Sequence, residues 1–161
     1  MRQVLALLCA GTVALAATGA AFSTGPVREP VVFEPFTFAA GEVCPFAVTI
    51  DTVVNKEILK DFGDHLIITG RLVAQVTNDD TGNSVVLNIS GPAKVVFTED
   101  AATQYGRGLG LNFFFPGDLG PGEEGALLWT RGPMIQRFSE EGLEVVRMAP
   151  VVRDVCAMLA A

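Results

Sequence analysis

ITGRLVAQVTNDDTGNSVVLNIS, which spans residues 68–90, is the stretch that decides the fold class of this chain. Apolar and polar residues alternate on both sides of the polar segment 78–83, as they do in strands with one buried face. Asn, Asp and Gly in that segment tolerate the backbone conformations that tight turns require. The stretch therefore predicts a β-hairpin.

The rest of the chain after Cys44 repeats this pattern, with short apolar or alternating runs at a spacing of roughly 8–12 residues. These runs predict further strands at residues 46–51, 56–60, 93–98, 109–115, 126–130, 134–138, 143–148 and 151–156. Helical periodicity is confined to a turn near the C-terminus, so the strands should be antiparallel. We expect an all-β antiparallel meander that forms a small closed or nearly closed, lipocalin-like β-barrel, with a β-sandwich as the alternative.

The first 20 residues read as a signal peptide, with Arg2 before an apolar run and small residues at 18–20. Residues 21–43 contain three prolines and suggest an extended, partly ordered lead-in, which leaves 44–161 as a single β domain. The sequence thus predicts a secreted, extracellular protein that has no membrane segment after cleavage.

Removal of the signal peptide leaves Cys44 and Cys156 as the cysteines of the mature chain. In an oxidising compartment an even number of cysteines favours a disulfide, and this one would join the two ends of the domain. Two thiols alone make a poor metal site, so we expect no metal and no cofactor.

The net charge of the full chain is −7, and its basic residues are scattered singly along the sequence. A nucleic-acid partner needs a cluster of basic residues, so nucleic acid is excluded as the expected partner. Loss of Arg2 makes the mature chain still more acidic, which argues against adhesion to anionic lipid.

Three segments carry a likeness to known sequences: residues 67–72, residues 76–91 and the ending 152–159. Through them the chain resembles small exported β-rich proteins of unknown function from high-GC Gram-positive bacteria (actinobacteria). The resemblance implies a signal peptide, a β-rich domain and a terminal cysteine pair, and it brings no catalytic residues.

An apolar pocket is the sharpest functional hypothesis that the residues support. Its lining would come from Phe97, Leu109, Leu111, Phe113, Phe115 and Trp129. A small barrel instead fills its interior with such side chains, and both outcomes stay open. Alternation along 106–115 places Leu111 and Phe113 in the core and Phe114 on the other side, with glycines at 106, 108 and 110 that favour sheet curvature or close packing.

Two polar features are considered as a catalytic residue and as a calcium site, and the sequence favours neither role. His65 follows Asp64, but neighbouring residues of a strand point to opposite faces, so a solvated turn histidine is the expectation and no catalytic residue is assigned. The oxygen-rich turn at 78–83 lacks the spacing of a calcium loop and is read as a solvated hairpin turn.

The leading hypothesis is a secreted, non-enzymatic protein that binds a small apolar ligand or a cell-surface component. One alternative is a cyclase or isomerase that orders its substrate in an apolar barrel pocket, an analogy at the level of fold. The other is a structural or interaction protein that has no small ligand.

Overall fold

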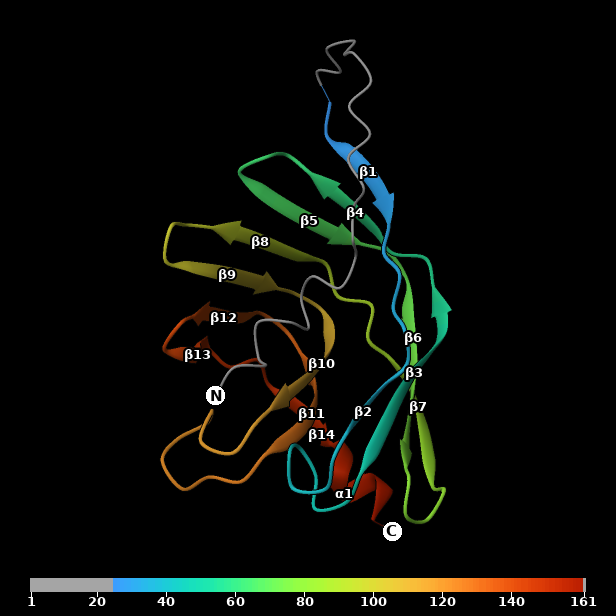
Figure 1. Ribbon diagram of the computed structural model, residues 1–161. Helices are drawn as coiled ribbons and strands as arrows, with labels where there is room; N and C mark the ends of the chain where they lie inside the picture. The colour runs from blue at the N-terminus through green and yellow to red at the C-terminus, as the bar shows by residue number, and fades with distance from the viewer. Residues whose placement is uncertain (1–24, 161) are drawn as a thin grey trace.

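A computed structural model describes residues 25–160 of the chain and shows antiparallel β-sheet with one short helix in that range (Figure 1). The strands are β1 (Val27–Pro30), β2 (Phe36–Phe38), β3 (Val48–Asn55), β4 (Ile58–Asp61), β5 (His65–Thr69), β6 (Leu72–Asn78), β7 (Ser84–Asn88), β8 (Ala93–Phe97), β9 (Ala101–Gly106), β10 (Leu109–Phe114), β11 (Ala126–Arg131), β12 (Met134–Ser139), β13 (Gly142–Arg147) and β14 (Val151–Asp154). The helix, α1 (Val155–Leu159), follows β14 directly.

The strands form three sheets. Sheet A has the order β1-β4-β5-β8-β9-β12-β13, sheet B the order β2-β3-β6-β7, and sheet C the order β10-β11-β14. Along the sequence, the strands alternate between sheet A and one of the two smaller sheets. Pairs such as β3 and β4, β5 and β6, or β9 and β10 are therefore the two halves of one long, bent strand. These long strands are ordered in space as they are in sequence, so the predicted antiparallel meander is confirmed.

The expectation of a closed barrel is wrong for the described residues. The outer strands of sheet A, β1 and β13, do not pair with each other, and no ladder joins β7 of sheet B to β10 of sheet C. The long strands bend sharply where they leave sheet A, and beyond the bend their outer halves separate into two sheets. Sheets B and C then pack against each other through side chains, in a sandwich-like arrangement.

The bends lie side by side and are joined by backbone hydrogen bonds, for example from Lys56 N to Arg71 O at 2.8 Å and from Arg107 N to Pro92 O at 3.0 Å. Neighbouring backbones approach closely there. A Cβ atom on Gly91 would lie 2.2 Å from the carbonyl oxygen of Leu109, a separation that real Cβ atoms do not reach. The line of bends therefore depends on glycine at this position.

We expect Gly91→Ala to destabilise the protein by more than about 2 kcal/mol, because a backbone segment must move to admit the methyl group. Gly106→Ala is the matched control, since the nearest atom to its added Cβ is Met134 Cβ at an ordinary 3.7 Å. That variant should stay within about 1 kcal/mol of the wild type. Urea denaturation of both variants measures the contrast, and equal losses would contradict the close approach at Gly91.

The main hydrophobic core fills the space between sheets B and C and beneath α1. Its fully buried members come from all three elements and include Val48, Val76, Leu127, Val155 and Leu159. Leu111, Phe115 and Trp129 of the predicted pocket pack against this cluster. The region between the two sheets is therefore filled with side chains.

A second core cluster lies on the other side of sheet C. Phe114 is fully buried there beside Met134 of β12, and Leu143 and Val145 of β13 pack against them. Strand β10 is thus covered on both faces. The expectation that Phe113 belongs to the core is wrong: its side chain is 37% exposed, and its ring contacts Phe36 and Phe38 at the border of the main core.

The N-terminal segment does more than lead into the domain. Strand β1 pairs with β4 and β2 pairs with β3, although prolines had indicated an extended segment without ladder pairing. Pro30 fits because β1 is an edge strand, where a residue without an N–H can be placed. Strand β9 was not predicted at all, because its sequence AATQYG is neither clearly alternating nor strongly apolar. The predicted signal peptide, residues 1–20, lies outside the described residues.

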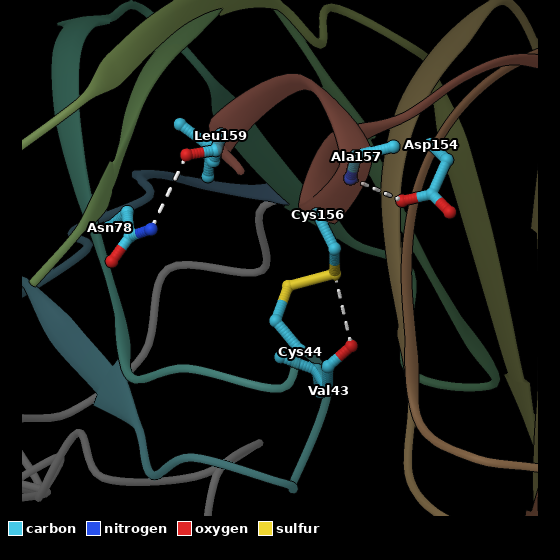
Figure 2. Close-up of a disulfide and its surroundings, with 7 residues drawn as sticks. All are labelled: Val43, Cys44, Asn78, Asp154, Cys156, Ala157 and Leu159. Atoms are coloured by element: carbon cyan, nitrogen blue, oxygen red, sulfur yellow. Dashed lines mark hydrogen bonds between the residues drawn. A yellow bond between two sulfur atoms is a disulfide. The ribbon is translucent and has the colours of Figure 1, made fainter. Parts of the chain in front are cut away.

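The C-terminus is fixed by a disulfide between Cys44 and Cys156, whose Cα atoms are 5.5 Å apart (Figure 2). The predicted pairing is confirmed, although Cys156 lies in α1 and not at the end of a strand. Asp154 caps the helix by accepting a hydrogen bond from Ala157 N at 3.1 Å. Cys156 Sγ also lies 3.2 Å from the carbonyl oxygen of Val43, a close contact and not a hydrogen bond because oxidised sulfur carries no proton.

Candidate functional site

Cross-strand register sorts the side chains of sheet A onto two faces, because directly paired residues share a face. We call one of them the apolar face, which consists of three rows. The rows are Glu29-Leu59-Ile68-Ala93-Gly106-Met134, Val27-Asp61-Leu66-Val95-Gln104-Gln136-Val145, and Phe97-Ala102-Phe138-Leu143. None of the three rows contains Lys or Arg. The apolar face is therefore hydrophobic with a few neutral and acidic polar groups.

Sheet C covers the apolar face only at the end formed by β12 and β13, through the second core cluster. Among residues 25–160, no side chain of β4, β5, β8 or β9 belongs to either cluster. Leu66 and Val95 stay half-buried, and Phe97 is 53% exposed. These four strands span about 14 Å at the usual strand spacing. A sheet face of this kind is normally covered by another layer.

A pair of amides lies at the border between the covered and the uncovered parts. Gln104 of β9 and Gln136 of β12 are direct cross-strand partners on the apolar face. The side chain of Gln136 is only 6% exposed, and within residues 25–160 neither amide makes a side-chain hydrogen bond. No side-chain nitrogen or oxygen buried in the described part of the chain lacks a hydrogen-bond partner, so the Gln136 amide still reaches solvent. It can therefore bond to water or to a polar group of a ligand.

The structure brings only part of the residues predicted to line one pocket together. Leu111, Phe115 and Trp129 face the main core, and Trp129 Nε1 donates a 3.0 Å hydrogen bond to Asn88 O on the edge of sheet B. Leu109 is half-buried at the start of β10. Phe97 lies on the apolar face of sheet A, where it meets Ala102 across the strands. Of the predicted set, Phe97 is the member on the uncovered surface.

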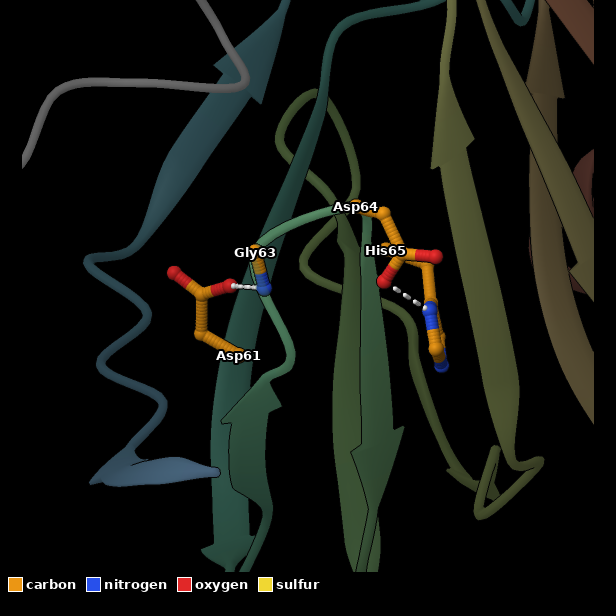
Figure 3. A network of polar contacts seen from close by, with 4 residues as sticks. All are labelled: Asp61, Gly63, Asp64 and His65. Carbon is orange, nitrogen blue, oxygen red and sulfur yellow. Dashed lines mark hydrogen bonds and ion pairs between the residues drawn. The ribbon is translucent and has the colours of Figure 1, made fainter. Parts of the chain in front are cut away.

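His65 does pair with Asp64, contrary to the expectation from strand alternation (Figure 3). Its Nδ1 lies 2.7 Å from Asp64 Oδ1, and its ring stacks on Phe62 with centroids 4.8 Å apart. The pair forms because Asp64 still belongs to the turn, where Asp61 Oδ1 also accepts a hydrogen bond from Gly63 N. The hydrogen bond from His65 lowers the pKa of the Asp64 carboxyl. No nucleophile is in hydrogen-bond contact with the described pair, so it stabilises the hairpin tip.

Glu57 is an unusual carboxylate at the bend between β3 and β4. It is only 6% exposed, and burial raises the pKa of its carboxyl. Its backbone is held firmly, since its N–H donates to Asn55 Oδ1 at 3.0 Å and its carbonyl accepts from Val31 N at 3.1 Å. The desolvated carboxyl is biased toward its neutral form, but it lies in the line of bends and away from the amide pair.

The oxygen-rich turn at 78–83 is not wholly solvated. Asn78 is 2% exposed, and its Nδ2 donates a 3.3 Å hydrogen bond to Leu159 O, which ties the hairpin to α1 (Figure 2). Asp79 Oδ2 accepts from Thr49 Oγ1 at 2.9 Å. Within residues 25–160 no group of three or more His, Cys, Asp or Glu side chains could hold a metal ion. The turn thus has a structural role in the described domain.

Two of the surface hollows formed by residues 25–160 could in principle hold a ligand. One, of about 510 Å³, lies beside the disulfide and is lined mainly by glycines and prolines, with Glu123 and Glu124 at its side. The other, of about 710 Å³, lies between the β8-β9 and β12-β13 turns and is lined by five acidic residues and Arg137. Neither has the wide surface of apolar side chains that the apolar face offers.

Comparison of the chain with protein-family models, with curated proteins and with solved structures found no match. Among the residues that the structure describes, no helix is long and apolar enough to cross a membrane. The apolar face of sheet A, with the Gln104–Gln136 pair at the border of its uncovered part, is the site that the geometry of this chain defines.

Proposed function

We propose that this is an exported, non-enzymatic binding protein whose apolar face holds an uncharged apolar molecule with one neutral hydrogen-bonding group. The observation that carries the proposal is the uncovered part of that face: within residues 25–160 no side chain of β4, β5, β8 or β9 belongs to a core cluster, and Phe97 is 53% exposed. At its border the Gln136 amide makes no hydrogen bond to the described protein and stays open to solvent. A hydroxyl or carbonyl group of a ligand would satisfy it, while the apolar part of the ligand lies over β5, β8 and β9.

The composition of the face supports an uncharged ligand. Its acidic residues, Glu29 and Asp61, lie at the β1-β4 end and would repel an anion. A cation would have to leave water for the hydrophobic rows around Leu66 and Val95, at a large cost in desolvation. Covering those rows with an apolar chain stabilises the complex by about 25 cal/mol for each Å² removed from water.

The filled region between sheets B and C supports a surface site over an enclosed one. The cyclase or isomerase hypothesis depends on an enclosed apolar pocket, and the side chains of the main core occupy that space. The disulfide supports export, because disulfides form and persist in the oxidising environment that exported proteins meet. We therefore propose that the protein binds its ligand on the face of sheet A and not in an enclosed interior.

Fluorescence titration with the neutral probe N-phenyl-1-naphthylamine tests the place of binding. The wild type should enhance the emission of the probe saturably, and Phe97→Asp should weaken binding at least about tenfold, because a charge then lies on the site. Val86→Asp is the matched control: Val86 is 59% exposed against 53% for Phe97, but it lies on sheet B. Equal affinities of the two variants, or no saturable enhancement by the wild type, would contradict the proposal.

The amide has a separate test, Gln136→Leu. We expect the wild type to bind dodecanol more tightly than dodecane in displacement of the probe, and the variant to lose this preference. A folded variant that keeps the preference for the alcohol would show that Gln136 has no part in binding.

A further inference from the structure

The opposite face of sheet A carries a continuous row of basic and apolar side chains. Seven residues that are direct cross-strand neighbours form it, one from each strand in sheet order. They are Arg28, Lys60, Ile67, Lys94, Tyr105, Ile135 and Arg147. We call this set the basic row. Six strand spacings make it about 29 Å long.

The cations of the row are available to a partner. Arg28, Lys94 and Arg147 are exposed, Lys60 is half-buried, and none of the four makes an ion pair with another residue in the range 25–160. Arg28 and Lys60 are direct neighbours, and like charges in that position repel each other. A protein whose net charge is −7 thus gathers unpaired positive charge in one place.

Acidic residues border this charge on one side. The turns at one end of the sheet A strands carry Asp64, Glu99, Asp100, Glu140 and Glu141, all exposed. Glu144, which pairs with Arg137 at 3.9 Å, adds to this border. An anionic plane laid on the face would meet the carboxylates of the turns. A linear polyanion that follows the basic row would pass three or more residues from those turns, about 10 Å or more, whereas screening limits their reach to about 8 Å. Only Glu144 of this border lies nearer, two residues from the row, where it pairs with Arg137.

We propose that the basic row binds a linear acidic polysaccharide whose charged sugars are separated by neutral ones. Its cations are spaced by one, two and three strands, or about 5, 10 and 14 Å, wider than the axial rise of about 3.4 Å per phosphate on one strand of a DNA duplex. Tyr105, 44% exposed between Lys94 and Ile135, offers a ring face to a sugar. This surface is independent of the apolar face and of the ligand proposed for it.

Hyaluronan, in which each uronate alternates with a neutral sugar, is the probe for this surface. Titration calorimetry at 50 and 200 mM NaCl should show binding that weakens at least about tenfold between the two salt concentrations, because counterions are released. Neutral dextran should not bind.

Two charge-matched double variants locate the contact. Lys60→Glu with Lys94→Glu should weaken hyaluronan binding at least about tenfold, through loss of two cations and addition of two repulsive charges. Arg131→Glu with Arg153→Glu makes the same change in net charge outside the row, on sheet C, and should change affinity by less than about twofold. Circular dichroism of both variants shows that the fold is kept, and Tyr105→Ala, which changes no charge, tests the row if either double variant fails to fold.

An equal loss in the two double variants would mean attraction to general charge and would overturn the proposal. So would an absence of hyaluronan binding by the wild type. Tighter binding to phosphatidylglycerol vesicles or to a single-stranded oligonucleotide than to hyaluronan would equally overturn it, in favour of a membrane or a nucleic acid.

Discussion

Replacement of Cys44 and Cys156 together by serine is expected to lower the free energy of unfolding by roughly 4–5 kcal/mol. The bridge joins residues 112 positions apart, so the reduced chain gains the conformational freedom of a loop that contains most of the domain. It also fixes α1 against the loop between β2 and β3, where Val43 is fully buried. Guanidinium denaturation under non-reducing conditions measures the loss.

Reductant supplies the control for this prediction. Dithiothreitol should destabilise the wild type by a similar amount and leave the double serine variant unchanged. A loss below about 1 kcal/mol, or two reactive thiols in the folded, non-reduced wild type, would contradict the role of the bridge.

Phe114→Ala is expected to cost roughly 3–5 kcal/mol, because it empties a fully buried site between sheet C and the β12-β13 end of sheet A. Phe113→Ala on the same strand should cost clearly less, since 37% of its side chain already meets solvent. The pair is a matched comparison of neighbouring residues with the same side chain. Chemical denaturation measures it, and a larger loss at Phe113 would mean that the register of β10 is wrong.

The sequence predicted the strands best where one face is buried and the other is solvated. Strands β6 and β7 alternate over most of their length around Asn78 and Gly82, and the hairpin is found as predicted. Alternation also predicted the meander, since every turn is too short for a parallel crossover. The sequence could not show that Gly70 and Gly91 end one half of a strand and begin the next, because a bend and a continued strand have the same apolar pattern.

The error at Phe113 has the same origin. In a strand covered on both sides, alternation no longer separates core from solvent, and the three consecutive phenylalanines 113–115 fit either register. Only the packing of Met134 and Val145 on the far side of sheet C decides that Phe114 is the buried member.

Neither proposed binding surface could be predicted from the sequence. Gln104 and Gln136 are far apart in sequence and become neighbours only through the register of sheet A, which likewise places Lys60 and Lys94 in one row on either side of Ile67. The scattered basic residues that argued against a polyanion in the sequence are the same residues that the sheet gathers in one row. Leu66 and Ile67 have similar apolar side chains, but they lie on opposite faces of the sheet.

Photoaffinity labelling with a dodecanol that carries a diazirine on its alkyl chain tests the central claim, binding at the apolar face, most directly. After irradiation and peptide mass spectrometry, we expect label on the alternate residues of that face, such as Leu66, Val95 and Phe97, and competition by unlabelled dodecanol. Label on Ile67 and Val96, on sheet B around Val86, or spread without competition would contradict the account.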